Sequence, residues 1–104
     1  MTLRDVVNGI GDISDDLVIF ATKTDVWQPD DIAALVLESD AIEIGTKMED
    51  LSYFLEVYIA KEVLDVWSEW RDGRTPSQDE CLEAIVFYAE NDAYLGEDVG
   101  IRNL

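Results

Sequence analysis

The chain has 104 residues, of which 48% are hydrophobic and 10% aromatic, so it can bury the core of one domain without disulfides or metal ions. Its 24 acidic and 7 basic residues give a formal net charge of -17, beyond the magnitude of about 2–8 that suits a small domain. The aromatic content excludes a disordered acidic tail, and the shortage of bases excludes direct binding to nucleic acid or to an anionic membrane.

The first predicted element is a short helix over residues 2–10. Thr2 can cap its N-terminus, and apolar residues recur at helical spacing from Leu3 to Ile10. Gly9 then favours the end of this helix.

Two predicted strands follow. Residues 17–22 form a short apolar run rich in β-branched and aromatic residues, which is typical of a buried strand. Residues 32–38 contain two alanines and fit a strand or a helix, and their short length favours a strand. A turn-rich connection over residues 27–31 joins the two, and residues 39–50 are expected to form a loop.

The pattern changes after this loop. Residues 53–58 fit either a third strand or the start of a helix. From Ile59 to Trp70 the apolar residues recur at steps of three and four, which predicts a helix. An Asp-Gly pair at residues 72–73 is expected to end it.

The last helix has the clearest start. Thr75 is expected as its N-cap, with Pro76 at the first helical position, and its apolar stripe continues to about Asn91. The sequence therefore predicts one α+β domain over residues 1–104. It would consist of a small antiparallel sheet of about three strands, with a short N-terminal helix and two C-terminal helices packed on it.

Several kinds of chemistry are excluded by residues that the chain lacks. It has no histidine and a single cysteine, Cys81, so the usual catalytic triads and the Cys/His metal sites cannot form within it. Glycine-rich phosphate loops and calcium-binding loops are also missing. We therefore expect no cofactor, no metal and no enzymatic activity, with Cys81 a small, partly buried hydrophobic residue. Without disulfides, a signal peptide or a membrane-spanning stretch, a cytoplasmic location is expected.

The acidic residues gather in the predicted connections, where binding residues also concentrate. Solvated loops would explain any single cluster. Carboxylates can also pair with Arg and Lys of a partner. Trp27 lies in a loop between acids and is the best single candidate for an exposed anchor, with burial in the core as the alternative. Trp67 and Trp70 share a helical face and are expected in the core. The residues expected to bind a partner are Trp27, Asp30, Asp31, Glu38, Asp40, Glu43, Glu49, Asp50, Glu90 and Asp92.

Three segments, residues 15–21, 53–57 and 88–94, resemble a family of small acidic bacterial proteins of unassigned function. The stretch Tyr-x-x-Asn-Asp-Ala-Tyr over residues 88–94 is the most specific of them. The resemblance implies a bacterial or phage α+β domain and supplies no activity. In size and charge alone, the chain is also similar to immunity proteins that neutralise toxic nucleases and to phage inhibitors that imitate DNA.

The leading functional prediction is an inhibitory protein-binding module. It would be an immunity protein or antitoxin that neutralises a basic effector such as a nuclease toxin, with the acidic field steering the encounter. One alternative is a phage-encoded anti-defence protein that acts as a DNA mimic. Others are a small enzyme that uses paired carboxylates, and an acidic structural module with no partner. The sequence leaves the oligomeric state open.

Overall fold

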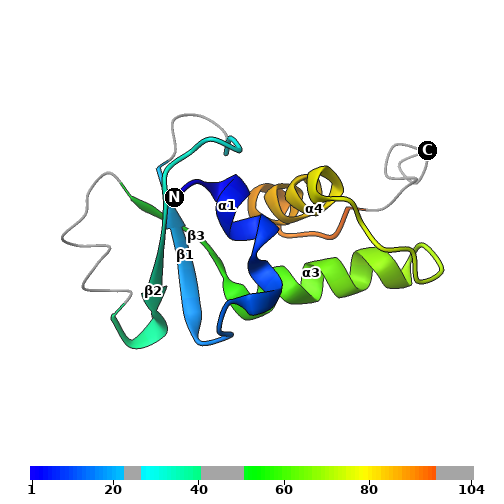
Figure 1. The fold of residues 1–104 in the computed structure, drawn as a ribbon, viewed down its shortest axis with the longest axis horizontal. Coiled ribbons are helices and arrows are strands. Elements are labelled where there is room, and N and C mark those ends of the chain that lie inside the picture. The colour runs from blue at the N-terminus through cyan, green and yellow to red at the C-terminus, as the bar shows by residue number, and fades with distance from the viewer. Residues whose placement is uncertain (23–26, 41–50, 96–104) are drawn as a thin grey trace.

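The computed structural model describes residues 1–22, 27–40 and 51–95. Three helices lie on one side of a three-stranded sheet (Figure 1), which confirms the predicted α+β fold. The order of elements is α1 (Leu3–Asn8), a 3-10 turn (Ile10–Asp12), β1 (Leu17–Ala21), β2 (Ala33–Leu37), a second 3-10 turn (Glu38–Asp40), β3 (Ser52–Glu56), α3 (Val57–Glu69) and α4 (Gln78–Asn91).

The first predicted strand is the central strand of the sheet. β1 pairs antiparallel with β2 on one side and with β3 on the other, in the order β2-β1-β3. Val18 and Phe20 are 3% and 5% exposed, and their neighbours Ile19 and Ala21 are fully buried. Successive residues of a strand point to opposite faces, so β1 is buried on both faces. This explains its unbroken apolar run.

The ambiguous residues 53–58 contain both a strand end and a helix start, since β3 ends at Glu56 and α3 begins at Val57. Ile19 pairs with Leu55 and Phe20 pairs with Tyr53, so the register shifts at this point. The shift leaves Phe54 as the extra residue of a bulge, and it is 2% exposed. Its ring meets the ring of Trp27 edge-on, at 4.9 Å between centroids.

The helix α1 begins as the sequence predicts. The hydroxyl of Thr2 accepts a hydrogen bond from the backbone N–H of Asp5 at 3.2 Å, and the backbone N–H of Thr2 donates to the Asp5 carboxylate at 3.0 Å. This capping box satisfies two otherwise unpaired donors. The bond from the Thr2 backbone, together with the one from its hydroxyl, lowers the pKa of Asp5. Gly9 forms the C-cap, as expected.

The end of α3 corrects one prediction about the tryptophans. Trp67 is buried, but Trp70 is 45% exposed, so the expectation that both lie in the core is wrong for Trp70. The helix ends at Glu69, and Trp70 leaves its core-facing stripe to contact the ring of Tyr94. The chain then turns through Gly73 at φ 81°, a left-handed conformation that glycine adopts without strain.

The start of α4 corrects another prediction. Its N-cap is Ser77 and not Thr75, because Ser77 and Glu80 form a capping box. The Ser77 hydroxyl accepts from the Glu80 backbone N–H at 3.1 Å, and the Glu80 carboxylate accepts from the Ser77 backbone N–H at 3.0 Å. Pro76 therefore precedes the cap. A cap at Thr75 would give up this reciprocal pair of hydrogen bonds.

Replacing Ser77 with alanine is expected to lower the free energy of unfolding by about 1 kcal/mol, because the cap hydroxyl is lost. Thr75→Ala is the matched control and is expected to change it by less than about 0.5 kcal/mol. The backbone bond from Ser77 lowers the pKa of Glu80 from 4.5. The stabilisation of the folded state by ionised Glu80 is therefore present above pH 4.5 and is lost as the pH falls through the lowered pKa. Urea titrations of the two variants at neutral pH measure the difference, and an equal cost would contradict the assignment of the cap.

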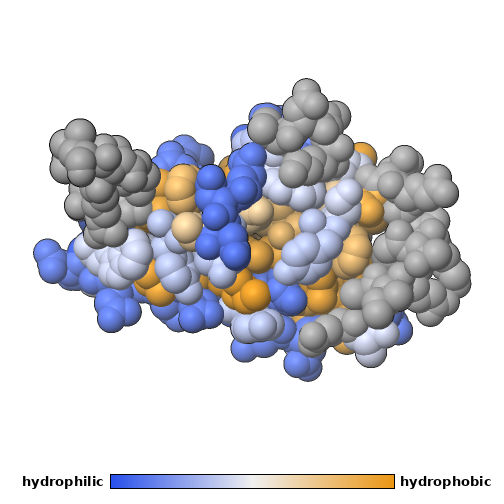
Figure 2. Space-filling model, turned by 180° about the vertical axis from the view of Figure 1, so that it is seen from behind, coloured by the Kyte–Doolittle hydropathy of each residue, from blue (hydrophilic) through white to orange (hydrophobic). Residues whose placement is uncertain are grey.

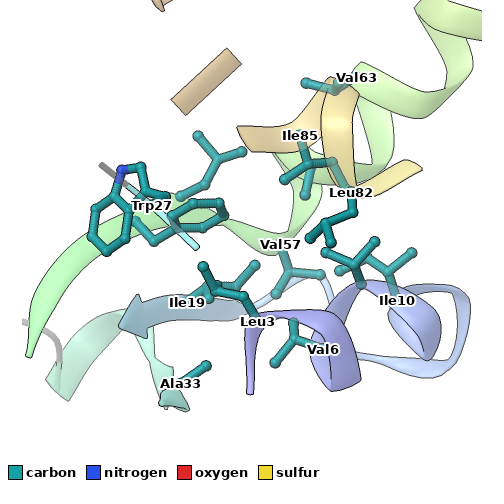
Figure 3. Packing of buried hydrophobic residues seen from close by; sticks show 14 of the residues in the cluster. Leu3, Val6, Ile10, Ile19, Trp27, Ala33, Val57, Val63, Leu82 and Ile85 are labelled. Carbon is teal, nitrogen blue, oxygen red and sulfur yellow. The ribbon is translucent and has the colours of Figure 1, made fainter. Parts of the chain in front are cut away.

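The core lies between the sheet and the helices. Side chains of α1, β1 and α4 point toward one another there (Figure 3), including Leu3, Ile19 and Ile85, which are fully buried. α4 therefore packs one of its faces into the core and leaves another free at the surface.

Candidate functional site

A pocket of about 400 Å³ lies between α4 and the connection from β1 to β2. This volume is within the range of about 300–1,000 Å³ that is usual for binding sites. Figure 2 shows a face of the molecule on which hydrophobic side chains form an area bordered by hydrophilic ones. The pocket is lined by Trp27, Pro29, Asp79, Leu82, Glu83, Val86, Phe87, Glu90 and Asn91.

The regular spacing of α4 builds one wall of this pocket. Asp79, Glu83, Val86 and Glu90 recur at steps of three and four, so they share one face of the helix. Leu82 lies beside them, 8% exposed, where this face meets the core. One helix therefore supplies both apolar wall and acidic residues.

The opposite wall is Trp27 with Pro29, and its geometry overturns a prediction. Trp27 is 6% exposed and packs against Phe54, so the exposed anchor is wrong and the alternative, a residue of the core, is confirmed. The bulge in β3 that turns Phe54 inward gives the indole its packing surface. Trp27 thus reaches the surface as part of a pocket wall.

Local hydrogen bonds fix the conformation of the turn that follows Trp27. The Asp31 carboxylate accepts from the backbone N–H of Gln28 at 2.8 Å, and the Asp31 N–H donates to the Gln28 carbonyl. The Pro29 carbonyl accepts from the backbone N–H of Arg4 at 3.0 Å. Asp31 is therefore a structural residue of this turn, which fixes Pro29 against α1.

Three carboxylates border the pocket and have no cationic partner in the part of the chain that the structure describes. Asp79, Glu83 and Glu90 are exposed, and none of them forms an ion pair with any residue that the structure describes. Asp79 and Glu83 are four residues apart on one helix, an arrangement that costs about 0.2–0.5 kcal/mol when both are charged. The repulsion between these two carboxylates therefore slightly destabilises α4 beside the pocket.

The bases in the described segments are engaged elsewhere. Arg4 pairs with Asp30 at 2.9 Å, Lys61 pairs with Asp15 at 2.6 Å, and Arg74 pairs with Glu80 at 2.8 Å. Arg71 donates to the backbone carbonyls of Trp67 and Leu95, and the guanidinium groups of Arg71 and Arg74 lie 4.2 and 4.8 Å from the Trp67 ring centre. None of these four side chains lines the pocket.

The structure brings together two of the residues expected to bind a partner, Trp27 and Glu90. Asp40 follows β2, whereas the pocket residue Pro29 precedes that strand, so Asp40 belongs to the other end of β2. Asp92 is the left-handed C-cap of α4, where its N–H donates to the Tyr88 carbonyl at 2.8 Å. Asp30 and Asp31 belong to the turn described above. Outside the described part of the chain are Glu43, Glu49, Asp50 and the side chain of Glu38.

Sequence reasoning missed two acidic residues of the pocket, Asp79 and Glu83. Their spacing with Glu90 on one predicted helix was a usable signal, because residues four and seven apart share a face. Val86 is half-buried, packs against the core and also lines the pocket.

Cys81 is half-buried on α4, in agreement with its expected role as a small hydrophobic residue. Burial raises the pKa of its thiol, and the nearby charge of Glu80 adds a smaller increase. The raised pKa disfavours the reactive thiolate. Across residues 1–22, 27–40 and 51–95 no group of His, Cys, Asp or Glu is arranged to hold a metal ion. Within the same segments, no helix combines the length and apolar character needed to cross a membrane.

Comparison with known proteins finds a family model that covers most of the chain. A family model described as a domain of unknown function matches residues 1–96. No curated protein and no solved structure matches the chain. The match confirms a family of unassigned function and brings no activity with it.

Proposed function

The chain belongs to the DUF7716 family of domains of unknown function, and we propose that it binds a basic protein through the α4 pocket and thereby inhibits that protein. The observation that carries the proposal is an apolar pocket bordered by Asp79, Glu83 and Glu90, three carboxylates without a described ion-pair partner. The partner would be an effector such as a nuclease toxin, and the chain its immunity protein or antitoxin. A bacterial or phage origin and a cytoplasmic location belong to the same proposal.

The charge of the chain supports a positively charged partner. The net charge is -17, and Arg4, Lys61 and Arg74 are already paired within the molecule. Such a field accelerates encounter with a cationic surface and repels nucleic acid. Enzymes that act on nucleic acids carry cationic surfaces where phosphates bind. An acidic protein that covers such a surface blocks the substrate.

The pocket provides an apolar anchoring site that slows dissociation, which charge alone does not provide. Charge complementarity mainly raises the association rate, whereas apolar side chains seated in a pocket slow dissociation. Trp27 and Phe87 provide aromatic walls for such an anchor. A tight inhibitor needs both properties, and here they lie on the same face of α4.

The test is capture of the partner from the native host, followed by association kinetics with two matched variants. Glu83→Gln combined with Glu90→Gln is expected to slow association about tenfold and to reduce its salt dependence. Asp12→Asn combined with Asp16→Asn removes the same charge from exposed residues outside the pocket, and a much smaller effect is expected. Absence of a tight basic partner, or equal effects of the two pairs, would contradict the proposal.

The acids outside the described residues need their own variant. Neutralising Glu43, Glu49 and Asp50 together in the captured complex tests whether the predicted loop also contributes to binding. We expect a smaller effect on the dissociation rate than from the loss of the pocket's apolar walls, because charge acts mainly on the association rate.

One observation favours a second candidate, mimicry of DNA. α3 carries Glu62, Asp65 and Glu69, all exposed and spaced three and four residues apart on one face. Together with the acids of α4, they give the molecule two acidic helix faces. A DNA mimic would compete with DNA for several unrelated DNA-binding proteins, whereas an immunity protein would bind one effector only.

A further inference from the structure

We infer that the pocket receives an α-helix of the partner, with an apolar residue at its centre and a Lys or Arg on each side. The inference rests on the proposed function and specifies what the proposed partner presents. It follows from the backbone chemistry of the pocket walls and from the spacing of the acids on α4.

The walls of the pocket offer few backbone partners to an incoming strand. One wall is α4, whose internal backbone groups bond to one another along the helix. On the other wall, the N–H and carbonyl of Gln28 bond to Asp31. Pro29 has no N–H, and its carbonyl accepts from Arg4. A peptide seated against these residues must therefore satisfy most of its own backbone groups, which a helix does and an extended strand does not.

The spacing of the acidic residues on α4 determines the spacing expected for the cations of the partner helix. Glu83 and Glu90 are seven residues apart on α4, which corresponds to two turns and about 10.5 Å along the helix axis. Val86 and Phe87 lie between them in the pocket lining. A partner helix alongside α4 would match this pattern with cations about two turns apart and an apolar residue between them.

A competing mode of binding lies elsewhere on the molecule. β2 and β3 are the outer strands of the sheet, and an edge strand can accept an extended peptide through backbone hydrogen bonds. Binding there would select sequences that alternate with a period of two. The two modes therefore differ in the sequence pattern, the conformation and the location of the bound peptide.

Selection from a display library tests the inference. The probe is a random peptide library of about 15 residues, long enough to follow the pocket face of α4 as a helix. It is selected on the whole chain at about 0.3 M salt to suppress non-specific attraction. The expected peptides carry cations about seven residues apart with an apolar residue between them, become helical on binding, and shift the NMR signals of residues 79–91. Against Glu83→Gln with Glu90→Gln their affinity should fall about tenfold, and against Asp12→Asn with Asp16→Asn it should change little.

Each contrary result is decisive. Peptides of period two, binding in an extended form, or signals that shift on β2 or β3, would overturn the helical occupant. So would the absence of any salt-resistant peptide, or equal affinity for both pairs of variants. Capture of a native basic partner that tolerates the pocket variants leaves the inhibitory function standing and removes this inference. Helical peptides that bind at the pocket, with no native basic partner found, would support this inference and contradict the inhibitory function.

Discussion

Replacing Trp27 with alanine is expected to lower the free energy of unfolding by about 3–5 kcal/mol, the usual cost of removing a buried aromatic side chain. The indole is 6% exposed and meets the Phe54 ring edge-on at 4.9 Å. Its loss leaves a cavity between the bulge of β3 and α4 and removes one wall of the pocket. Equilibrium urea unfolding, followed by far-UV circular dichroism, measures the change.

Trp70→Ala is the matched control, because Trp70 is 45% exposed and its ring contacts the Tyr94 ring. It is expected to cost about 1 kcal/mol, the scale of one aromatic pair. If the two alanine variants had equal stability, the buried position of Trp27 would be wrong. Trp27→Phe separates the two roles of the indole, since it retains much of the packing while changing the wall of the pocket.

The second large effect is expected from charge reversal at the pocket. Glu83→Lys combined with Glu90→Lys should weaken binding of the proposed basic partner about 100-fold or more, since like charges brought together across an interface cost several kcal/mol. The same pair should raise the stability of the free chain by about 0.5 kcal/mol. The change at Glu83 turns a repulsive pair with Asp79 into an attractive one, and the change at Glu90 places a cation near the C-terminal end of the helix.

Opposite changes in stability and affinity distinguish a binding residue from a structural one. Titration calorimetry with the captured partner measures the affinity, and thermal unfolding measures the stability of the free chain. Asp12→Lys combined with Asp16→Lys changes the net charge by the same amount outside the pocket. If this control weakened binding as much as the α4 variant, the partner would respond to total charge and not to the pocket.

The sequence predicted the elements well where a local signal and the tertiary environment agree. Thr2 caps α1, the apolar run of β1 is buried, and residues 72–73 follow the end of α3. It was less successful where two local signals competed. Thr75 followed by Pro76 resembles a helix start, yet the reciprocal bonds between Ser77 and Glu80 determine the cap.

The site was harder to predict because it depends on contacts between distant segments. Trp27 lies among acids in the sequence, which suggests exposure, but a bulge in β3 places Phe54 against it. The sequence indicates Glu90 as a binding residue from its place near a connection, but it does not single out Asp79 in the first turn of the helix or Glu83 in its interior. Helical spacing relates these three acids to one another. Only the docking of α4 beside Trp27 shows that they border an apolar pocket.

The burial of β1 on both faces has a consequence for folding of the nascent chain. Its antiparallel partners, β2 and β3, both follow it in the sequence, so an emerging chain exposes Leu17–Ala21 before either edge can be covered. Short apolar segments of this kind associate readily with copies of themselves. Asp15 and Asp16 stand directly before β1, where charges oppose such association. We therefore expect these two aspartates to oppose aggregation of the nascent chain.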